Sequence, residues 1–148
     1  ALSYVLSPSL RLDFVLETIN RMVEKHGDEL SNKTMVHSDQ GTHYTSIQFS
    51  KLLKDRNLLQ SMSRRANCWD NAPQESFFGH MKDEIGERVT SSYTYSQVKA
   101  IVDEWMDHYN TDRYQWDLAK LSPNQYYKYC MTGEYPLKRK ESSKEKKK

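Results

Sequence analysis

The stretches VHSDQGTHYTS (residues 36–46) and ANCWDNAPQESFFGHMKDEI (residues 66–85) decide how this chain is interpreted. The first contains Asp39 directly after a short apolar run, a pattern typical of a strand end. The second contains Glu75, near the start of a helix that Pro73 can open. Thirty-five residues separate the two carboxylates. We interpret Asp39 and Glu75 as a pair of metal ligands and weigh the rest of the chain against that hypothesis.

Lys82 follows Glu75 by two helical turns, so both side chains leave nearly the same helix face about 10 Å apart. Mg²⁺ binds carboxylate oxygens and completes its coordination with waters and substrate phosphates. Two such ions about 4 Å apart promote phosphoryl transfer, and Lys82 would hold a phosphate of the bound strand. Taken singly, these residues favour ordinary roles: Asp39 as a turn residue, Glu75 as an acid at a helix N-terminus, Lys82 as a solvated cation.

The composition indicates one domain with a core of its own, because the chain has 148 residues of which 36% are hydrophobic. We expect a cytoplasmic protein, because the sequence has no long apolar run and no signal segment at its start. The two cysteines, Cys68 and Cys130, are far apart and are expected to be reduced. Residues 138–148 hold seven basic and two acidic side chains, whereas residues 1–137 hold 15 basic and 18 acidic ones. Any polyanion would therefore meet local basic patches and a basic tail.

The periodicity of apolar residues predicts alternating strands and helices, hence an α/β fold. The order strand, helix, strand between residues 33 and 61 predicts a partly parallel sheet. We expect Trp105 and Trp116 to be core or packing residues. The expected strands are at residues 2–6, 33–36 and 58–61. The expected helices are one opened by Ser7-Pro8 and ended by Gly27, one after a capping box at Thr45, one over residues 73–85, and two after capping boxes at Thr94 and Ser122.

Several short motifs, taken together, resemble the catalytic core of IS3-type insertion-sequence transposases, which are relatives of the retroviral integrases. The resemblance extends over roughly residues 1–130, in the same order as in that family. The motifs are His37-Ser38-Asp39-Gln40-Gly41, Tyr44-Thr45-Ser46, Asp70-Asn71-Ala72, Glu75-Ser76-Phe77-Phe78, Lys82, Tyr109-Asn110, Arg113 and Leu121-Ser122-Pro123.

This resemblance implies an RNase H-like fold, a mixed sheet flanked by helices, here lacking its first strand or strands. It implies a polynucleotidyl transferase with a two-metal site for Mg²⁺ or Mn²⁺, which nicks DNA ends and joins their 3′-hydroxyls to a target. Asp39 and Glu75 correspond to the second and third catalytic acids, and the first acid would fall before Ala1. We therefore expect residues 1–131 to be an N-terminally incomplete catalytic core, inactive by itself, and residues 132–148 to be a basic, disordered tail.

The partner implied by the resemblance is DNA, both element ends and target, acted on by a homo-oligomer. Lys82, Arg64, Arg65 and Asn71 are the residues we expect to contact it. One alternative is a catalytically inactive remnant that binds DNA or pairs with an intact transposase. Another is an RNase H-like nuclease that acts on a different nucleic acid.

Overall fold

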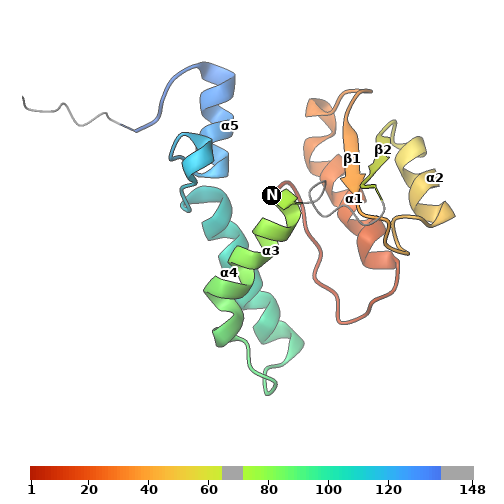
Figure 1. Cartoon of the computed structure of the whole chain (residues 1–148), viewed down its shortest axis with the longest axis horizontal. Coiled ribbons are helices and arrows are strands. Elements are labelled where there is room, and N and C mark those ends of the chain that lie inside the picture. The colour runs from red at the N-terminus through yellow and green to blue at the C-terminus, as the bar shows by residue number, and fades with distance from the viewer. Residues whose placement is uncertain (65–71, 138–148) are drawn as a thin grey trace, which may run out of the picture. The chain divides into compact units, whose positions relative to one another are not determined.

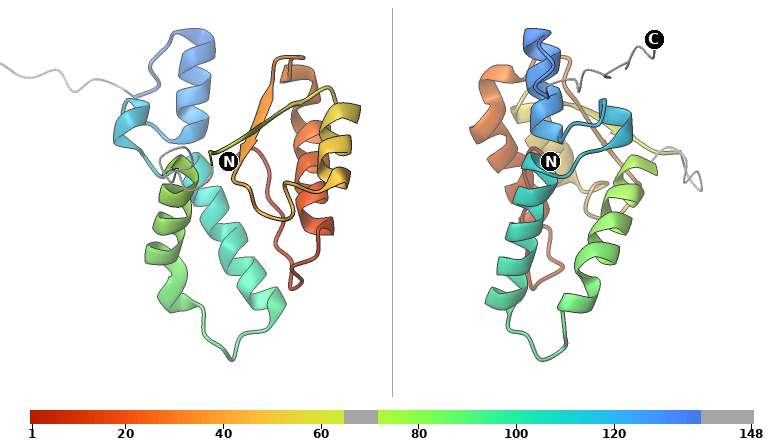
Figure 2. Two further views of the ribbon diagram at one scale, coloured as in Figure 1. Left: turned by 45° about the vertical axis from the view of Figure 1, so that its right-hand side comes forward. Right: turned by 90° about the vertical axis from the view of Figure 1, so that its left-hand side faces the viewer.

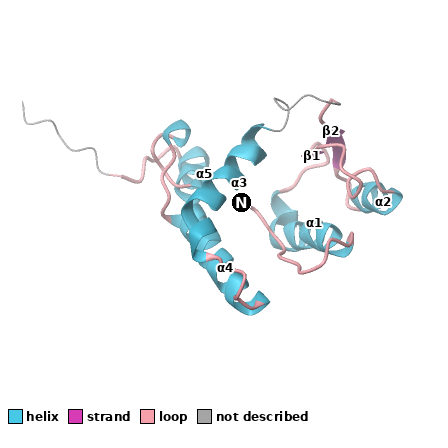
Figure 3. Cartoon of the chain, turned by 60° about the horizontal axis from the view of Figure 1, so that its bottom comes forward, coloured by secondary structure: helices cyan, strands magenta, loops and turns pink. Residues whose placement is uncertain are grey.

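The computed structural model describes residues 1–64 and 72–137, in which helices predominate over one small sheet (Figures 1 and 3). The expectations for Arg65, Cys68 and Asn71 fall on residues outside this range, as does the tail apart from residues 132–137. The chain forms two compact units, residues 1–103 and 104–148. The expected division at residue 131 remains a prediction. The elements are α1 (Asp13–His26), β1 (Met35–Ser38), α2 (Ile47–Asp55), β2 (Leu59–Met62), α3 (Ala72–Ile85), α4 (Tyr95–Thr111) and α5 (Pro123–Thr132), with the 3₁₀ turns η1 (Gly27–Glu29), η3 (Gly86–Arg88) and η4 (Trp116–Leu118).

The two strands run parallel, with Met35 opposite Leu59 and Ser38 opposite Met62. Because α2 lies between them in the sequence, β1, α2 and β2 form the strand, helix, strand unit that the sequence predicted. Both strands begin one or two residues later than expected. The α/β character is therefore confirmed within the described residues, and a larger mixed sheet stays a prediction.

The core of the first unit lies between α1, α2 and the strand pair, which stay together in both views of Figure 2. Val36 of β1 packs against this cluster, while Met35 remains 57% exposed. One face of the sheet is thus covered by the amphipathic sides of α1 and α2. The buried members are Val15, Ile19, Phe49, Leu53 and Leu58.

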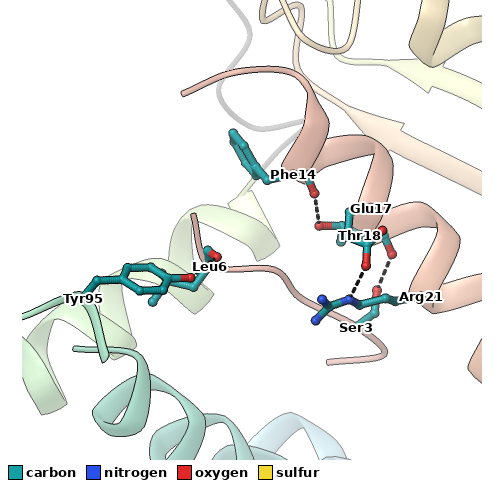
Figure 4. A network of polar contacts seen from close by, with 7 residues as sticks. All are labelled: Ser3, Leu6, Phe14, Glu17, Thr18, Arg21 and Tyr95. Atoms are coloured by element: carbon teal, nitrogen blue, oxygen red, sulfur yellow. Dashed lines mark hydrogen bonds and ion pairs between the residues drawn. The ribbon is translucent and has the colours of Figure 1, made fainter. Parts of the chain in front are cut away.

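The strand predicted at residues 2–6 is wrong, because this segment pairs with no strand of the described chain. It is instead held by side-chain hydrogen bonds to helices (Figure 4). The Ser3 hydroxyl donates to the Thr18 carbonyl of α1 at 2.8 Å, and the Tyr95 hydroxyl donates to the Leu6 carbonyl at 2.6 Å. Tyr4 donates to Asp103 at 2.7 Å. Apolar residues at alternate positions therefore line an extended connection here and do not form a strand.

The N-terminal end of α1 also differs from the expectation. The helix begins at Asp13, because the Ser7 hydroxyl accepts the Ser9 N–H in a local turn and does not cap a helix. At its other end the helix stops at His26 as expected. Gly27 keeps a right-handed conformation and leads into η1, so the end does not depend on a left-handed cap.

The three expected capping boxes have different outcomes. At α2 the cap is Ser46, whose hydroxyl accepts the Phe49 N–H at 3.2 Å, so the Thr45 prediction is off by one residue. Gln97 Oε1 accepts the Thr94 N–H before α4, as predicted. The Ser122 box is complete before α5, and left-handed Gly133 ends that helix. The boxes at Thr94 and Ser122 were thus predicted correctly, whereas Thr45 and Gln48 have the same spacing and do not cap α2.

The second unit also contains buried side chains. Trp105 and Met106 are buried, and Leu121 and Ser122 are fully enclosed. The prediction that Trp105 is a core or packing residue is confirmed by its burial. Trp116 does not lie in the core, because its side chain is 70% exposed, although its ring contacts Tyr114 and Lys120. Among residues 1–64 and 72–137, no helix has the length and apolar character needed to cross a membrane.

Candidate functional site

Asp39 lies at the carboxyl end of β1, directly after Ser38. In open α/β sheets this is the edge at which ligands bind. The side chain is exposed, and its Oδ1 accepts the Gly41 N–H at 2.8 Å. A Cβ added to Gly41 would lie 2.9 Å from the same Oδ1. Glycine at this position therefore allows the backbone to approach and orient the carboxylate.

The exit of β1 is fastened to the end of β2 through Ser63. The Ser63 N–H donates to the Ser38 carbonyl at 2.8 Å, and its carbonyl accepts Gln40 Nε2 at 3.1 Å. The His37 ring contacts two hydroxyls, with Nδ1 3.0 Å from Ser61 Oγ and Nε2 3.1 Å from Ser63 Oγ. Ser63 is 5% exposed. These four contacts hold Asp39 on a braced strand end.

Tyr44 closes the loop that follows Asp39. Its ring meets Phe49 edge to face, and its carbonyl accepts Gln60 Nε2 at 2.8 Å. Burial raises the pKa of the Tyr44 phenol, and the negative charge of Asp39 raises it further. The phenol therefore stays neutral across the physiological range and places no second negative charge next to Asp39.

Glu75 lies in the first turn of α3 and Lys82 in its last turns. Both side chains are exposed, and neither forms a hydrogen bond or an ion pair with any residue of the described chain. The helix confirms the expected placement of the pair, because a separation of seven residues puts them on nearly the same face. The apolar side of α3 ends in the buried Ile85.

No hydrogen bond or ion pair joins Asp39 to Glu75 in the described part of the chain. Within the same residues, no group of three or more His, Cys, Asp or Glu side chains is arranged to hold a metal ion. Arg64 is described and exposed, just beyond Ser63, whereas Arg65 and Asn71 lie outside the described residues.

The sequence did not indicate the part played by Ser61, Ser63, Gln40 and Gly41. The hydrogen bonds of His37 depend on the register of β1 against β2, which sequence periodicity does not give. A weak signal was present, because serines at positions 61 and 63 alternate along a strand and must share one face. In the structure the His37 ring contacts the hydroxyls of Ser61 and Ser63 and so links β1 to β2 and its exit.

Comparison with known proteins defines the class. Residues 56–123, which include Glu75, Lys82 and Arg64 but not Asp39, match the family model described as Integrase core domain. Such a core implies an RNase H-like fold, with which the parallel strand pair and its helices are compatible.

Several insertion-sequence proteins are similar to this chain. An uncharacterized transposase-like protein of Haemophilus influenzae is 38% identical over 113 residues, covering 74% of this chain and 51% of that protein. The putative transposase InsK of insertion sequence element IS150 from Escherichia coli K12 is 35% identical over 124 residues, which cover 82% of this chain and 44% of InsK. The transposase of element IS904 from Lactococcus lactis is 34% identical over 95 residues, covering 64% and 38%. Together these matches show that the chain is similar to insertion-sequence transposases of the IS3 type with an integrase-type core. It spans about half the length of the first two relatives.

Proposed function

We propose that the chain supplies part of the catalytic core of a metal-dependent transposase that nicks DNA at element ends and joins the freed strand to a target. The observation that carries this proposal is the position of Asp39 at the carboxyl end of a braced parallel strand, in a chain similar to insertion-sequence transposases. Glu75 and Lys82 on one face of α3 support it.

The donor set fits a hard divalent cation. Glu75 offers both carboxylate oxygens, and Asp39 offers Oδ2, since Oδ1 accepts the Gly41 N–H. Mg²⁺ or Mn²⁺ prefers such oxygen ligands, and Asp39 and Glu75 would hold it together with the other ligands of the two-metal site. When bound, the metal lowers the pKa of the attacking hydroxyl and stabilises the leaving oxygen.

The two reactions are both displacements at phosphorus. In the first, water attacks the phosphorus at the element end, the P–O3′ bond breaks, and a 3′-hydroxyl is released. In the second, that hydroxyl attacks a target phosphodiester, one P–O bond forms and one breaks, and no external energy source is needed. The braced β1 exit keeps the Asp39 carboxylate in position throughout, as transfer within a fixed geometry requires.

Basic side chains near these acids would hold the DNA backbone. Lys82, two turns from Glu75, and the exposed Arg64 are the described candidates, and Arg65 and Asn71 complete the proposed set. Contacts to phosphates position the duplex without reading its sequence. Because two element ends must be joined, we expect the working assembly to be a homo-oligomer.

The test uses the complete gene product that contains this chain, with a plasmid carrying the element ends. Glu75→Gln and Asp39→Asn should each lower the rate of 3′-hydroxyl release in Mg²⁺ by at least about 100-fold, because each removes a metal-ligand charge. The dissociation constant for DNA should change less than about twofold. Asp83→Asn is the matched control, because it removes one exposed negative charge from the same helix.

Near-normal nicking by Glu75→Gln would refute the catalytic assignment. If the unmodified protein binds DNA but does not nick it in Mg²⁺ or Mn²⁺, the protein is the catalytically inactive, DNA-binding alternative. Lys82→Ala should weaken DNA binding and lower the slope of log K against log salt by about one, as the loss of one phosphate contact predicts.

A further inference from the structure

The turn between α4 and α5, whose backbone is drawn in Figure 1, carries two exposed aromatic side chains that the transposase chemistry proposed above does not use. Trp116 is 70% exposed and Tyr114 is 58% exposed. Their rings meet edge to face with centroids 6.2 Å apart. Large aromatic side chains are usually buried on one side, so an exposed pair of this size marks a surface that contacts another molecule.

The turn that carries the two rings is well anchored. Gln115 forms an isolated antiparallel bridge with Leu121, and its N–H donates to the Leu121 carbonyl at 3.0 Å. The Lys120 N–H donates to the Gln115 carbonyl, also at 3.0 Å. Leu121 is fully buried. The rings are therefore exposed on a fixed support.

The same turn contains backbone conformations that side chains of L residues disfavour. Ala119 and Lys120 have φ values of 54° and 61°, in the left-handed region. The Tyr135 hydroxyl donates to the Ala119 carbonyl at 2.9 Å and helps to hold this conformation. Gln115 Nε2 is buried without a hydrogen-bond partner in the described part of the chain. Strain of this kind is retained where it serves a site.

The strained turn places a cation on an aromatic face. Lys120 Nζ lies 4.6 Å from the centroid of the Trp116 ring, and Arg113 lies 5.9 Å from that of Tyr109. A flat ring stacks on any nucleobase, and a neighbouring ammonium group can contact the adjoining phosphate. A protein partner that buried Trp116 would also have to desolvate the Lys120 charge. The combination therefore fits a nucleic acid better than an apolar protein surface.

We propose that Tyr114, Trp116 and Lys120 form a stacking platform for an unpaired base of DNA, with Lys120 contacting its phosphate. The platform rests on the proposed function in one respect, since element ends that are opened for nicking supply such bases. Seven basic side chains in residues 138–148 follow in the sequence and add attraction for the same polyanion.

The test measures binding of the 148-residue chain to fluorescein-labelled oligothymidylate by anisotropy. Trp116→Ala should weaken binding about 5-fold or more, as the loss of one stacked base predicts, whereas Trp116→Phe should stay within about twofold. The same measurements on an oligonucleotide of abasic residues should show no effect of Trp116→Ala, because that strand has no base to stack. Tyr127→Ala is the matched control, because it removes an aromatic of α5 that is 51% exposed. Lys120→Ala should weaken binding to both strands.

Three results would overturn the platform. These are unchanged DNA binding by Trp116→Ala, an equal loss of affinity by this variant on the abasic strand, and a difference in molecular mass between the variant and the unmodified chain by light scattering. The last result would assign the surface to contacts between copies of the chain. Circular dichroism of each variant checks that it folds. Nicking by the complete gene product tests the proposed function separately, so an active enzyme with no effect at Trp116 refutes the platform alone.

Discussion

The substitution Gly41→Ala tests whether the geometry of the β1 exit controls the chemistry. The new Cβ would lie 2.9 Å from Asp39 Oδ1, whereas ordinary contact begins at 3.4 Å, so the carboxylate must move by about half an ångström. That movement also weakens the 2.8 Å hydrogen bond from the Gly41 N–H. Because a misplacement of about 1 Å can cost about 100-fold in rate, we expect kcat to fall about 10-fold.

The assay is release of 3′-hydroxyl ends by the complete gene product at saturating and limiting DNA. The KM for DNA should change less than about twofold, because Asp39 is proposed to hold metal and does not contact the DNA strand. The Mg²⁺ concentration for half-maximal rate should rise. Gly86→Ala is the control, since a Cβ there meets nothing within 4 Å. An unchanged kcat for Gly41→Ala, or equal losses in the two variants, would refute the reasoning.

The remaining predictions concern stability. Leu53→Ala should lower the free energy of unfolding by about 3 kcal/mol in urea titrations, because Leu53 is 1% exposed in the core, while Ile47→Ala on the same helix, 87% exposed, should change it by less than about 0.5 kcal/mol. Hydrogen bonds from Lys99, then Tyr4, hold the pKa of Asp103 below its ordinary value. The stabilisation by Asp103 is therefore complete above the unfolded pKa of about 3.9 and is lost as the pH falls through the folded pKa. The melting temperature of Asp103→Asn should therefore depend less on pH in that range than the melting temperature of the unmodified chain. An identical pH dependence in the two proteins would contradict this.

The features that could be predicted from the sequence are those set by neighbours along the chain. The boxes at Thr94 and Ser122 depend on residues within one turn, so their side chains identify them directly. The parallel pairing of β1 and β2 follows from one helix between two short apolar runs.

The features that could not be predicted depend on distant partners. The hydrogen bonds of His37 with the Ser61 and Ser63 hydroxyls depend on the register of β1 against β2, and 20 residues separate these strands in the sequence. The hydrogen bond from Tyr4 to Asp103 joins residues 99 apart in the sequence. It is one of the contacts with helices that the segment at residues 2–6 makes in place of strand pairing. Trp116 was expected to be a core or packing residue because aromatic side chains are buried on average, whereas in the structure it is 70% exposed.

The hydrogen bonds at Ser63 make Asp39 and Glu75 dependent on two different supports. Ser63 is fixed to the same strand exit that carries Asp39, and Glu75 belongs to a helix that starts at Ala72. Loss of the Ser63 contacts should therefore disturb the position of Asp39 and leave Glu75 on its helix.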